Sequence, residues 1–317
     1  MPPTVPEREL SFVIPVFNAE RTIGPVVERI LELYRDLTIE IVLVNDGSSD
    51  GSERACLALV ERFPATVVFL HLARNFGEHG AVLAGLNHAQ GRYVAILDDD
   101  GQNPPEEVRK LYRAIAESGQ DVVYGRYRVK RHDRWRNLGS WFHDRVANLM
   151  LHKPPELYLS SFKILNRFTV DEITRYKGAF PYIDGLILRA TRSLGQIEVN
   201  HRSAEGPSTY TLRKLVHLWL NMFLNFSITP LRISVLLGIT TSLVSLLLLV
   251  AIVVDKLYVN PDVTHGLPTV LVIVTFFAGV QLVILGTIGE YLGRLFLDHS
   301  SAPQFVVRYV RRGGDPT

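Results

Sequence analysis

The stretch YVAILDDDGQNPPEEV, residues 93–108, contains the unit that decides the fold of this chain. Its first five residues are apolar and typical of a short buried strand, and three consecutive acids, Asp98 to Asp100, follow at once. Asn103 then stands where a side chain caps the first turn of a helix, which the pattern predicts over 105–117. A buried strand, a polar loop and a helix form the repeating unit of a parallel sheet.

The same unit recurs throughout the first 125 residues. Apolar runs predict four further strands, namely LSFVIPV (10–16), IEIVLVN (39–45), TVVFLHL (66–72) and DVVYG (121–125). Helical stretches are expected near 22–35, 52–62 and 78–89. Because strands and helices alternate, we expect an α/β fold with a mostly parallel sheet covered by helices on both faces. From 126 to 210 the pattern is less regular.

The composition excludes several classes of protein. Of the 317 residues, 47% are apolar and 21% are charged, which excludes a disordered chain. A formal net charge of +2 gives no sign of the basic surface that binds nucleic acid. The only cysteine, Cys56, excludes a disulfide framework and a cysteine-rich zinc site, and it fits a reducing compartment.

Two long uncharged segments predict a membrane hairpin. Residues 233–254 and 267–288 each hold 22 residues, and a helix of that length spans ~33 Å, close to a hydrocarbon core of ~30 Å. Two buried helices of a soluble core are the alternative. The loop between the segments carries one Lys and two Asp, whereas Arg and Lys flank the pair on both outer sides. The positive-inside rule therefore places both ends in the cytoplasm.

The sequence thus predicts three parts. Residues 1–210 form a polar domain, and because its first ten residues hold no apolar leader, we expect it in the cytosol. Residues 211–230 have apolar side chains at helical spacing and predict an amphipathic helix in the membrane interface, or else a helix packed on the domain. Residues 231–317 hold the hairpin and a basic cytosolic tail.

The acidic triplet is the strongest sign of a functional site. Ligands of a parallel sheet collect beyond the carboxyl ends of its strands. Adjacent carboxylates repel one another, and a bound divalent cation removes this unfavourable repulsion. Mg²⁺ or Mn²⁺ typically binds one or two carboxylates together with phosphate oxygens. Asp98 and Asp100 would share one side of an extended segment, with Asp99 pointing elsewhere. A solvated loop with helix-capping acids is the alternative.

Other polar residues after the strands are further candidates. Asp46 opens a segment similar to the start of a calcium EF loop, but Leu57 stands where that loop needs Glu, which argues against calcium. The position of Asp46 after a strand favours an acceptor for a nucleoside base or ribose over a plain turn. Arg74, Arg126 and Lys163 are candidates for phosphate contacts, with ordinary ion pairs as the alternative.

At these residues the sequence resembles the family-2 glycosyltransferases of the GT-A fold, in their polyprenyl-phosphate branch. That branch includes dolichol-phosphate mannose synthases, bactoprenol glucosyltransferases and undecaprenyl-phosphate aminoarabinose transferases. The motifs follow the family's order over nearly the whole chain: IPVFNAE, VNDGSSDGS, LARNFGEHGAVLAGL, LDDDGQNPPEEV, and GPSTY before ITPLR and the two uncharged segments. The resemblance implies a Rossmann-like GT-A catalytic domain followed by an interfacial helix and a two-helix transmembrane hairpin.

Carried over by position, the resemblance also implies roles for particular residues. The catalytic, metal and diphosphate group would be Asp98, Asp100 and Gln102, with Mg²⁺ or Mn²⁺ as the cofactor. The nucleotide-binding residues would be Pro15, Phe17, Glu20, Asp46 and Asp99. The phosphate contacts would be Arg74, Arg126, Lys163, Arg202, Ser208 and Tyr210. The sequence departs from the family pattern at Asp99, which replaces a small residue, at Thr209, which replaces a lysine, and at Arg202, which is one residue out of register.

The implied reaction transfers a sugar from a nucleotide sugar, with UDP favoured over GDP, to polyprenyl phosphate such as undecaprenyl phosphate, with inversion. A phosphate monoester is already anionic near neutral pH because its second pKa is ~6, so the acceptor needs no catalytic base. The resemblance further implies the bacterial inner membrane, two spans with both termini cytoplasmic, and a homo-oligomer, which is a tetramer in relatives.

Two alternatives remain open. The first is a transferase that acts on a hydroxyl acceptor, similar to cellulose or hyaluronan synthases. Chains of that kind have more membrane spans and a Gln-x-x-Arg-Trp element. Here Arg131 stands in the place of that glutamine before Arg134-Trp135. The second alternative is a non-catalytic membrane protein that binds a nucleotide sugar, and the intact acidic triplet argues against it.

Overall fold

The computed structural model describes residues 8–127, 157–178, 181–200, 229–254, 257–258, 267–299 and 303–314. The chain divides into two compact units. One comprises residues 1–208 together with 301–317, and the other comprises residues 209–300.

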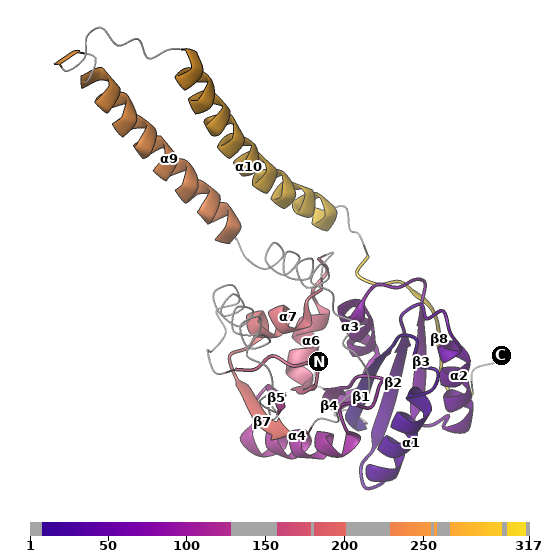
Figure 1. The fold of residues 1–317 in the computed structure, drawn as a ribbon. Helices are drawn as coiled ribbons and strands as arrows, with labels where there is room; N and C mark the ends of the chain where they lie inside the picture. Colours follow the sequence, from indigo (N-terminus) through magenta and orange to yellow (C-terminus); the bar gives the residue numbers. More distant parts are fainter. Residues whose placement is uncertain are drawn as a thin grey trace. The chain divides into compact units, whose positions relative to one another are not determined.

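In the described part of the first unit, eight strands form one sheet in the order β7-β5-β6-β4-β1-β2-β3-β8 (Figure 1). Their bounds are β1 (Arg8–Val16), β2 (Ile39–Asn45), β3 (Val67–Leu72), β4 (Gly91–Ile96), β5 (Val122–Tyr127), β6 (Lys163–Asn166), β7 (Leu194–Val199) and β8 (Val307–Arg311). The pairs β1–β2, β1–β4, β2–β3 and β5–β7 are parallel. Strand β6 runs antiparallel to β4 and β5, and β8 runs antiparallel to β3. The predicted α/β fold with a mostly parallel sheet is thus confirmed.

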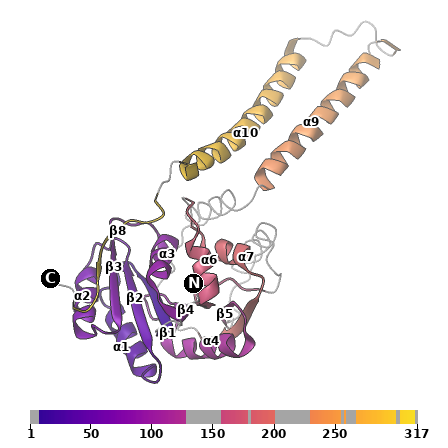
Figure 2. The same cartoon turned by 180° about the vertical axis from the view of Figure 1, so that it is seen from behind.

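Helices cover both faces of this sheet (Figures 1 and 2). One face carries α1 (Ile23–Leu33), α2 (Ser52–Arg62) and α4 (Pro105–Ser118), and the other carries α3 (Glu78–His88), α6 (Arg167–Thr174) and α7 (Ile183–Ala190). The alternation of side chains along β1 explains both layers. Phe12 and Ile14 pack into the core of the first face, and Val13 packs into the core of the second. Full burial of one such side chain contributes about 1.5–3 kcal/mol.

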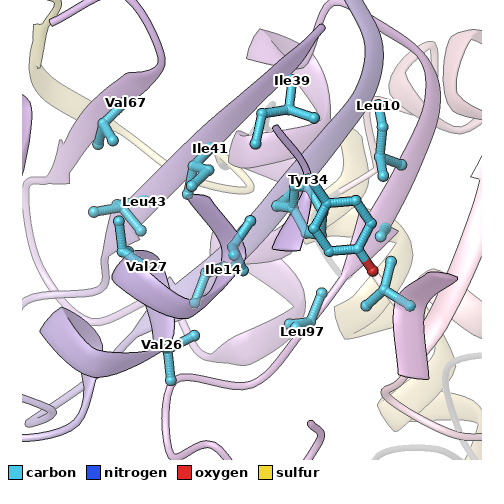
Figure 3. Close-up of a cluster of buried hydrophobic side chains, with 14 of the residues drawn as sticks. Leu10, Ile14, Val26, Val27, Tyr34, Ile39, Ile41, Leu43, Val67 and Leu97 are labelled. Carbon is cyan, nitrogen blue, oxygen red and sulfur yellow. The ribbon is translucent and has the colours of Figure 1, made fainter. Parts of the chain in front are cut away.

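Figure 3 shows the core beneath α1. The helix buries Ile23, Val26, Val27 and Ile30, a spacing that places all four side chains on one side of the helix. Tyr34, at the end of α1, is 1% exposed, and its hydroxyl donates to the Pro105 carbonyl at 2.8 Å. Packing of this kind holds the ends of the central strands in fixed positions.

Strand β8 was not expected from the sequence. Residues 307–311 fall in the segment predicted to be a basic tail, yet they pair with β3 over Phe69↔Arg311, Leu70↔Val310 and His71↔Tyr309. The chain therefore leaves the first unit, forms the second unit, and returns to complete the sheet of the first.

The described part of the second unit consists of α9 (Thr229–Val254), α10 (Leu267–His299) and the short stretch 257–258. The two helices contact each other, with Ser234 Oγ 3.4 Å from Thr287 Oγ1. Among the described helices, one has a stretch long and apolar enough to cross a membrane, Phe276–Gly293 in α10, whereas α9 has the shorter apolar stretch Ser234–Ser245. The predicted hairpin of two spans is therefore not confirmed. Residues 211–228 of the predicted interfacial helix lie outside the described residues.

Candidate functional site

The candidate site lies at the edge of the sheet where β1, β2, β3 and β4 end. Because these strands are parallel and adjacent, the segments that follow them meet at one edge. We call the segments 17–20, 46–51, 73–77 and 98–104 the carboxyl edge. Most of the side chains that the sequence singles out lie here.

Asp99 joins the segments after β1 and β4. Its Oδ2 accepts a hydrogen bond from the Phe17 backbone N–H at 2.9 Å, and the Phe17 ring is 51% exposed. Burial raises the pKa of Asp99 to about 6, and the neighbouring carboxylates of Asp100 and Asp98 push it in the same direction. Negative charge is therefore costly at this edge, which a bound cation would relieve.

Asp98 is held by two donors on one carboxylate oxygen. Asn103 Nδ2 donates to Asp98 Oδ2 at 2.6 Å, and Ser161 Oγ donates to the same atom at 3.0 Å. Asn103 Oδ1 in turn accepts from Tyr127 Oη at 2.7 Å, which fixes the amide orientation. Burial raises the pKa of Asp98, and the charge of Asp100 adds to the rise. Asp98 is thus oriented by side chains from three different segments.

The predicted role of Asn103 as a helix cap is wrong. The residue before the first turn of α4 is Pro104, which has no side-chain capping bond. The Asn103 side chain is 1% exposed and turns to Asp98 and Tyr127 instead. A buried amide between a carboxylate and a hydroxyl satisfies more hydrogen bonds there than it would at a helix end.

Asp100 and Gln102 contact each other in the same loop. The Gln102 backbone N–H donates to Asp100 Oδ1 at 2.9 Å, and Gln102 Nε2 donates to Asp100 Oδ2. Asp100 is exposed. Among the described residues, no group of three or more His, Cys, Asp or Glu side chains has the arrangement of a metal site. Two carboxylates together with diphosphate oxygens are a common donor set for Mg²⁺, and Asp98 and Asp100 supply two carboxylates from one loop.

Asp46 ties the segment after β2 to the segment after β3. It is 3% exposed and accepts from the backbone N–H groups of Phe76 at 2.7 Å and Gly77 at 2.9 Å. Burial raises its pKa, and these two N–H donors oppose the rise. Gly47 has φ +67°, and a Cβ there would stand 2.7 Å from the Asn75 nitrogen. The two loops therefore pack in direct backbone contact.

The other predicted residues of the edge have separate partners. Glu20 accepts from the Gly51 N–H at 3.2 Å and forms a 3.5 Å ion pair with Arg54, so it faces the start of α2. Pro15 lies within β1 opposite Val44. Arg74 is exposed and its guanidinium lies over the Phe76 ring, 4.5 Å from the ring centre. Arg126 is exposed near the end of β5.

Lys163 lies in the interior. It is 3% exposed and forms an ion pair with Asp184 of α7. Tyr124 Oη also donates to Asp184 Oδ1, at 3.0 Å. The Lys163 ammonium thus has a buried carboxylate partner inside the domain. Arg202, Ser208 and Tyr210 lie outside the described residues, as does the segment with Arg131 and Arg134-Trp135.

Several residues of this region were missed by sequence reasoning. Ser161 donates a hydrogen bond to Asp98 directly, and Tyr127 acts on Asp98 through Asn103. Glu78, in the first turn of α3, has its pKa raised by burial and, in second place, by the charge of Asp98. The serine pair before Lys163 was the available signal for Ser161, whereas nothing in the local sequence marks Tyr127 or Glu78.

Comparisons with known proteins identify the family. Residues 11–178 match the glycosyl transferase family 2 domain. The chain is 33% identical to an undecaprenyl-phosphate 4-deoxy-4-formamido-L-arabinose transferase of Serratia proteamaculans, over 96% of this chain and 94% of that one. It is 32% identical to a protein of the same name from Yersinia enterocolitica, with the same coverage.

A solved structure shares the fold. Glucosyl-3-phosphoglycerate synthase from Mycobacterium tuberculosis, crystallised with Mn²⁺, uridine diphosphate and glucosyl-3-phosphoglycerate, superposes with a TM-score of 0.52. The match covers 69% of this chain and 78% of that chain at 20% identity. At this identity the likeness concerns the fold.

Proposed function

The chain belongs to glycosyl transferase family 2 and is a glycosyltransferase, and from this premise we propose that it transfers a sugar from a UDP-sugar to undecaprenyl phosphate with inversion. The observation that carries the proposal is the group of carboxylates at the carboxyl edge, Asp46, Asp98, Asp99 and Asp100, three of which have pKa values raised by burial. Burying negative charge in this way is unfavourable unless a ligand offsets it.

The donor is the ligand that this edge fits. In this proposal Asp46 contacts the nucleoside, and Asp98 and Asp100 hold a divalent cation against the diphosphate. A bound Mg²⁺ or Mn²⁺ would neutralise charge on the departing nucleoside diphosphate. The chain's own residues orient the donor: Asn103 and Ser161 fix Asp98, and the N–H groups of the loop after β3 fix Asp46.

The acceptor is proposed from the relatives, which are named as undecaprenyl-phosphate 4-deoxy-4-formamido-L-arabinose transferases. The monoester oxygen of such a lipid is anionic near neutral pH, so it can attack the anomeric carbon without a base. The attack breaks the bond from that carbon to the diphosphate oxygen and inverts its configuration. Positioning and charge neutralisation then account for most of the catalysis.

The membrane topology is proposed from the course of the chain. Strand β8 pairs with β3, so residues 307–311 lie on the same side of any membrane as the sheet. The chain between them must cross an even number of times, and if α10 crosses once, α9 supplies the other crossing. The domain and both termini would then face the cytoplasm of a bacterial inner membrane.

Cysteine labelling tests this topology. The native Cys56 is fully buried and burial raises its pKa to about 12, so it reacts little. Tyr258→Cys, at a side chain 81% exposed between the two helices, should be labelled by an impermeant maleimide on intact cells. Arg308→Cys, exposed on β8, should be labelled only after the membrane is opened. Labelling of Arg308→Cys from outside would overturn the topology.

The reaction is tested with purified full-length protein in detergent. A panel of UDP-sugars that includes UDP-4-deoxy-4-formamido-L-arabinose, the sugar in the names of the relatives, is incubated with undecaprenyl phosphate and Mn²⁺. Mass spectrometry of the lipid should show one glycosylated product, which is lost on chelation of the metal. No lipid product from any donor, or transfer only to a hydroxyl acceptor, would contradict the proposal.

A further inference from the structure

The C-terminal segment, Pro303–Arg311, reaches the carboxyl edge from the far end of the chain. Its strand pairs with β3 in the register Leu70↔Val310 and His71↔Tyr309, and the Ala73 N–H donates to the Val306 carbonyl at 2.8 Å. Hydrogen bonding to this segment thus continues to residue 73. The loop 74–77, which supplies two N–H donors to Asp46, begins at the next residue.

Contacts of the C-terminal segment also fix the other end of that loop. Gln304 Nε2 donates to the carbonyls of Tyr176 at 2.9 Å and Gly178 at 2.7 Å. The Gln304 carbonyl would stand 3.2 Å from a Cβ at Gly80, so the segment lies against the first turn of α3. Phe305 packs on the same core cluster as Phe76 of the loop. The loop 74–77 is therefore bounded on both sides by this one segment.

A second series of contacts runs from Tyr309 to the turn after Asp46. The Tyr309 ring stacks on His71, with ring centres 5.1 Å apart and an interplanar angle of 9°. His71 Nδ1 lies 3.1 Å from Asn45 Nδ2. Asn45 Oδ1 accepts from the Ser48 N–H at 3.1 Å, inside the turn that follows Asp46.

We propose that the C-terminal segment is a positioning element for the nucleotide-sugar donor, acting on Asp46 through the loop 74–77 and through Tyr309, His71 and Asn45. The inference rests on the proposed function, because it assigns Asp46 to the donor. Two loops that are fixed before binding lose less conformational entropy when the nucleotide binds. Removing the contact should therefore weaken donor binding and leave the chemical step unchanged.

The test uses two substitutions of one residue in the full-length protein. Tyr309→Leu removes the ring that stacks on His71, whereas Tyr309→Phe keeps the ring and loses only the hydroxyl that donates to Glu53. For Tyr309→Leu we expect the KM for the UDP-sugar and the Kd for uridine diphosphate to rise about fivefold, which is about 1 kcal/mol at 1.4 kcal/mol per tenfold. The kcat and the KM for undecaprenyl phosphate should stay within about twofold. Tyr309→Phe and the exposed-site control Arg308→Ala should match the wild type.

A second variant covers the case in which Tyr309→Leu fails to fold. Gln304→Glu keeps the size of the side chain but sets a carboxylate against two carbonyl oxygens, and it should raise the same donor constants. Wild-type affinity for uridine diphosphate in the folded variants, or an equal rise in the KM of both substrates, would overturn the inference alone. Wild-type protein that neither binds uridine diphosphate nor transfers sugar would overturn the proposed function, and the inference with it.

Discussion

Replacing Asn103 by alanine should weaken the binding of a divalent cation at Asp98. The side chain is 1% exposed and supplies the shorter of the two hydrogen bonds to Asp98, 2.6 Å against 3.0 Å for Ser161. A hydrogen bond to a charged group contributes about 1.5–3 kcal/mol. If the cation-bound state loses about 2 kcal/mol because Asp98 is less well oriented, the dissociation constant for the cation rises about 30-fold. We therefore expect the Mn²⁺ concentration for half-maximal transfer to rise about 30-fold in Asn103→Ala.

The assay follows lipid product against Mn²⁺ concentration and measures Mn²⁺ binding directly by electron paramagnetic resonance. Two tyrosines give a matched comparison. Tyr127→Phe removes the hydroxyl that donates to Asn103 at 2.7 Å, and Tyr112→Phe removes one that donates to Glu9 at 3.0 Å, in the first residues of β1. The first should raise the Mn²⁺ requirement about fivefold and the second should not change it. Asn103→Ala with wild-type Mn²⁺ binding and an intact thermal transition would refute this role of Asn103.

Three further predictions concern Asp100, the buried ion pair and the half-buried His79. Asp100→Ala should lower transfer about 100-fold or more, measured as lipid product, because it removes a carboxylate placed for the cation. Lys163→Met leaves the Asp184 carboxylate, which is 7% exposed, without its ammonium partner. The free energy of unfolding, measured by chemical denaturation, should fall by about 3–5 kcal/mol. The double variant Lys163→Met, Asp184→Leu should regain most of this loss because it removes the unpaired buried charge. Burial lowers the pKa of His79 from 6.5 to about 4, so between these pH values the unfolded chain binds more protons than the folded protein. The contribution of neutral His79 to the free energy of unfolding is therefore complete above pH 6.5 and falls by up to about 3 kcal/mol as the pH decreases to 4. This pH-dependent loss should be absent in His79→Gln.

Each of these predictions has a clear contrary result. Transfer at the wild-type rate by Asp100→Ala would show that Asp100 does not bind the cation. A Lys163→Met protein as stable as the wild type would show that the ion pair makes no net contribution. The same loss of stability between pH 6.5 and 4 in His79→Gln would assign the acid sensitivity to other groups.

The part of the fold that the sequence predicts well is the part built from local patterns. The five apolar runs before residue 126 match β1 to β5, because a strand buried on both faces is a continuous apolar run. Strand β6 holds only four residues, KILN, and its antiparallel partners are β4 and β5. No pattern of four residues can show such pairing. Strand β8, VRYVR, holds two arginines and a tyrosine with two valines and follows a long apolar helix, so its charges suggested a tail rather than a sheet edge.

The candidate site divides in the same way. The acids at the ends of β2 and β4 are evident from the sequence, because position after a buried strand is a local property. Asp98 and Asp100 have local partners in Asn103 and Gln102. The other hydrogen bonds are not local: Asp99 is held from residue 17, Asp98 also from residue 161, and Asp46 from residues 76 and 77. The same limit explains Lys163, whose partner Asp184 lies 21 residues further on and on the helix α7.

These hydrogen bonds orient the carboxyl edge for the charged donor that we propose. Asp46 and Asp99 accept from backbone N–H groups of neighbouring loops, and Asp98 accepts from two side chains, so all three carboxylates are oriented before any ligand arrives. The pKa values of the three are nevertheless raised, because burial outweighs the hydrogen bonds. The fold therefore carries an electrostatic cost at this edge in its free form. In the proposed function, a cation or a donor that removes this cost would bind to groups that need no reorganisation, and such preorganised charge is the largest common source of catalysis in enzymes.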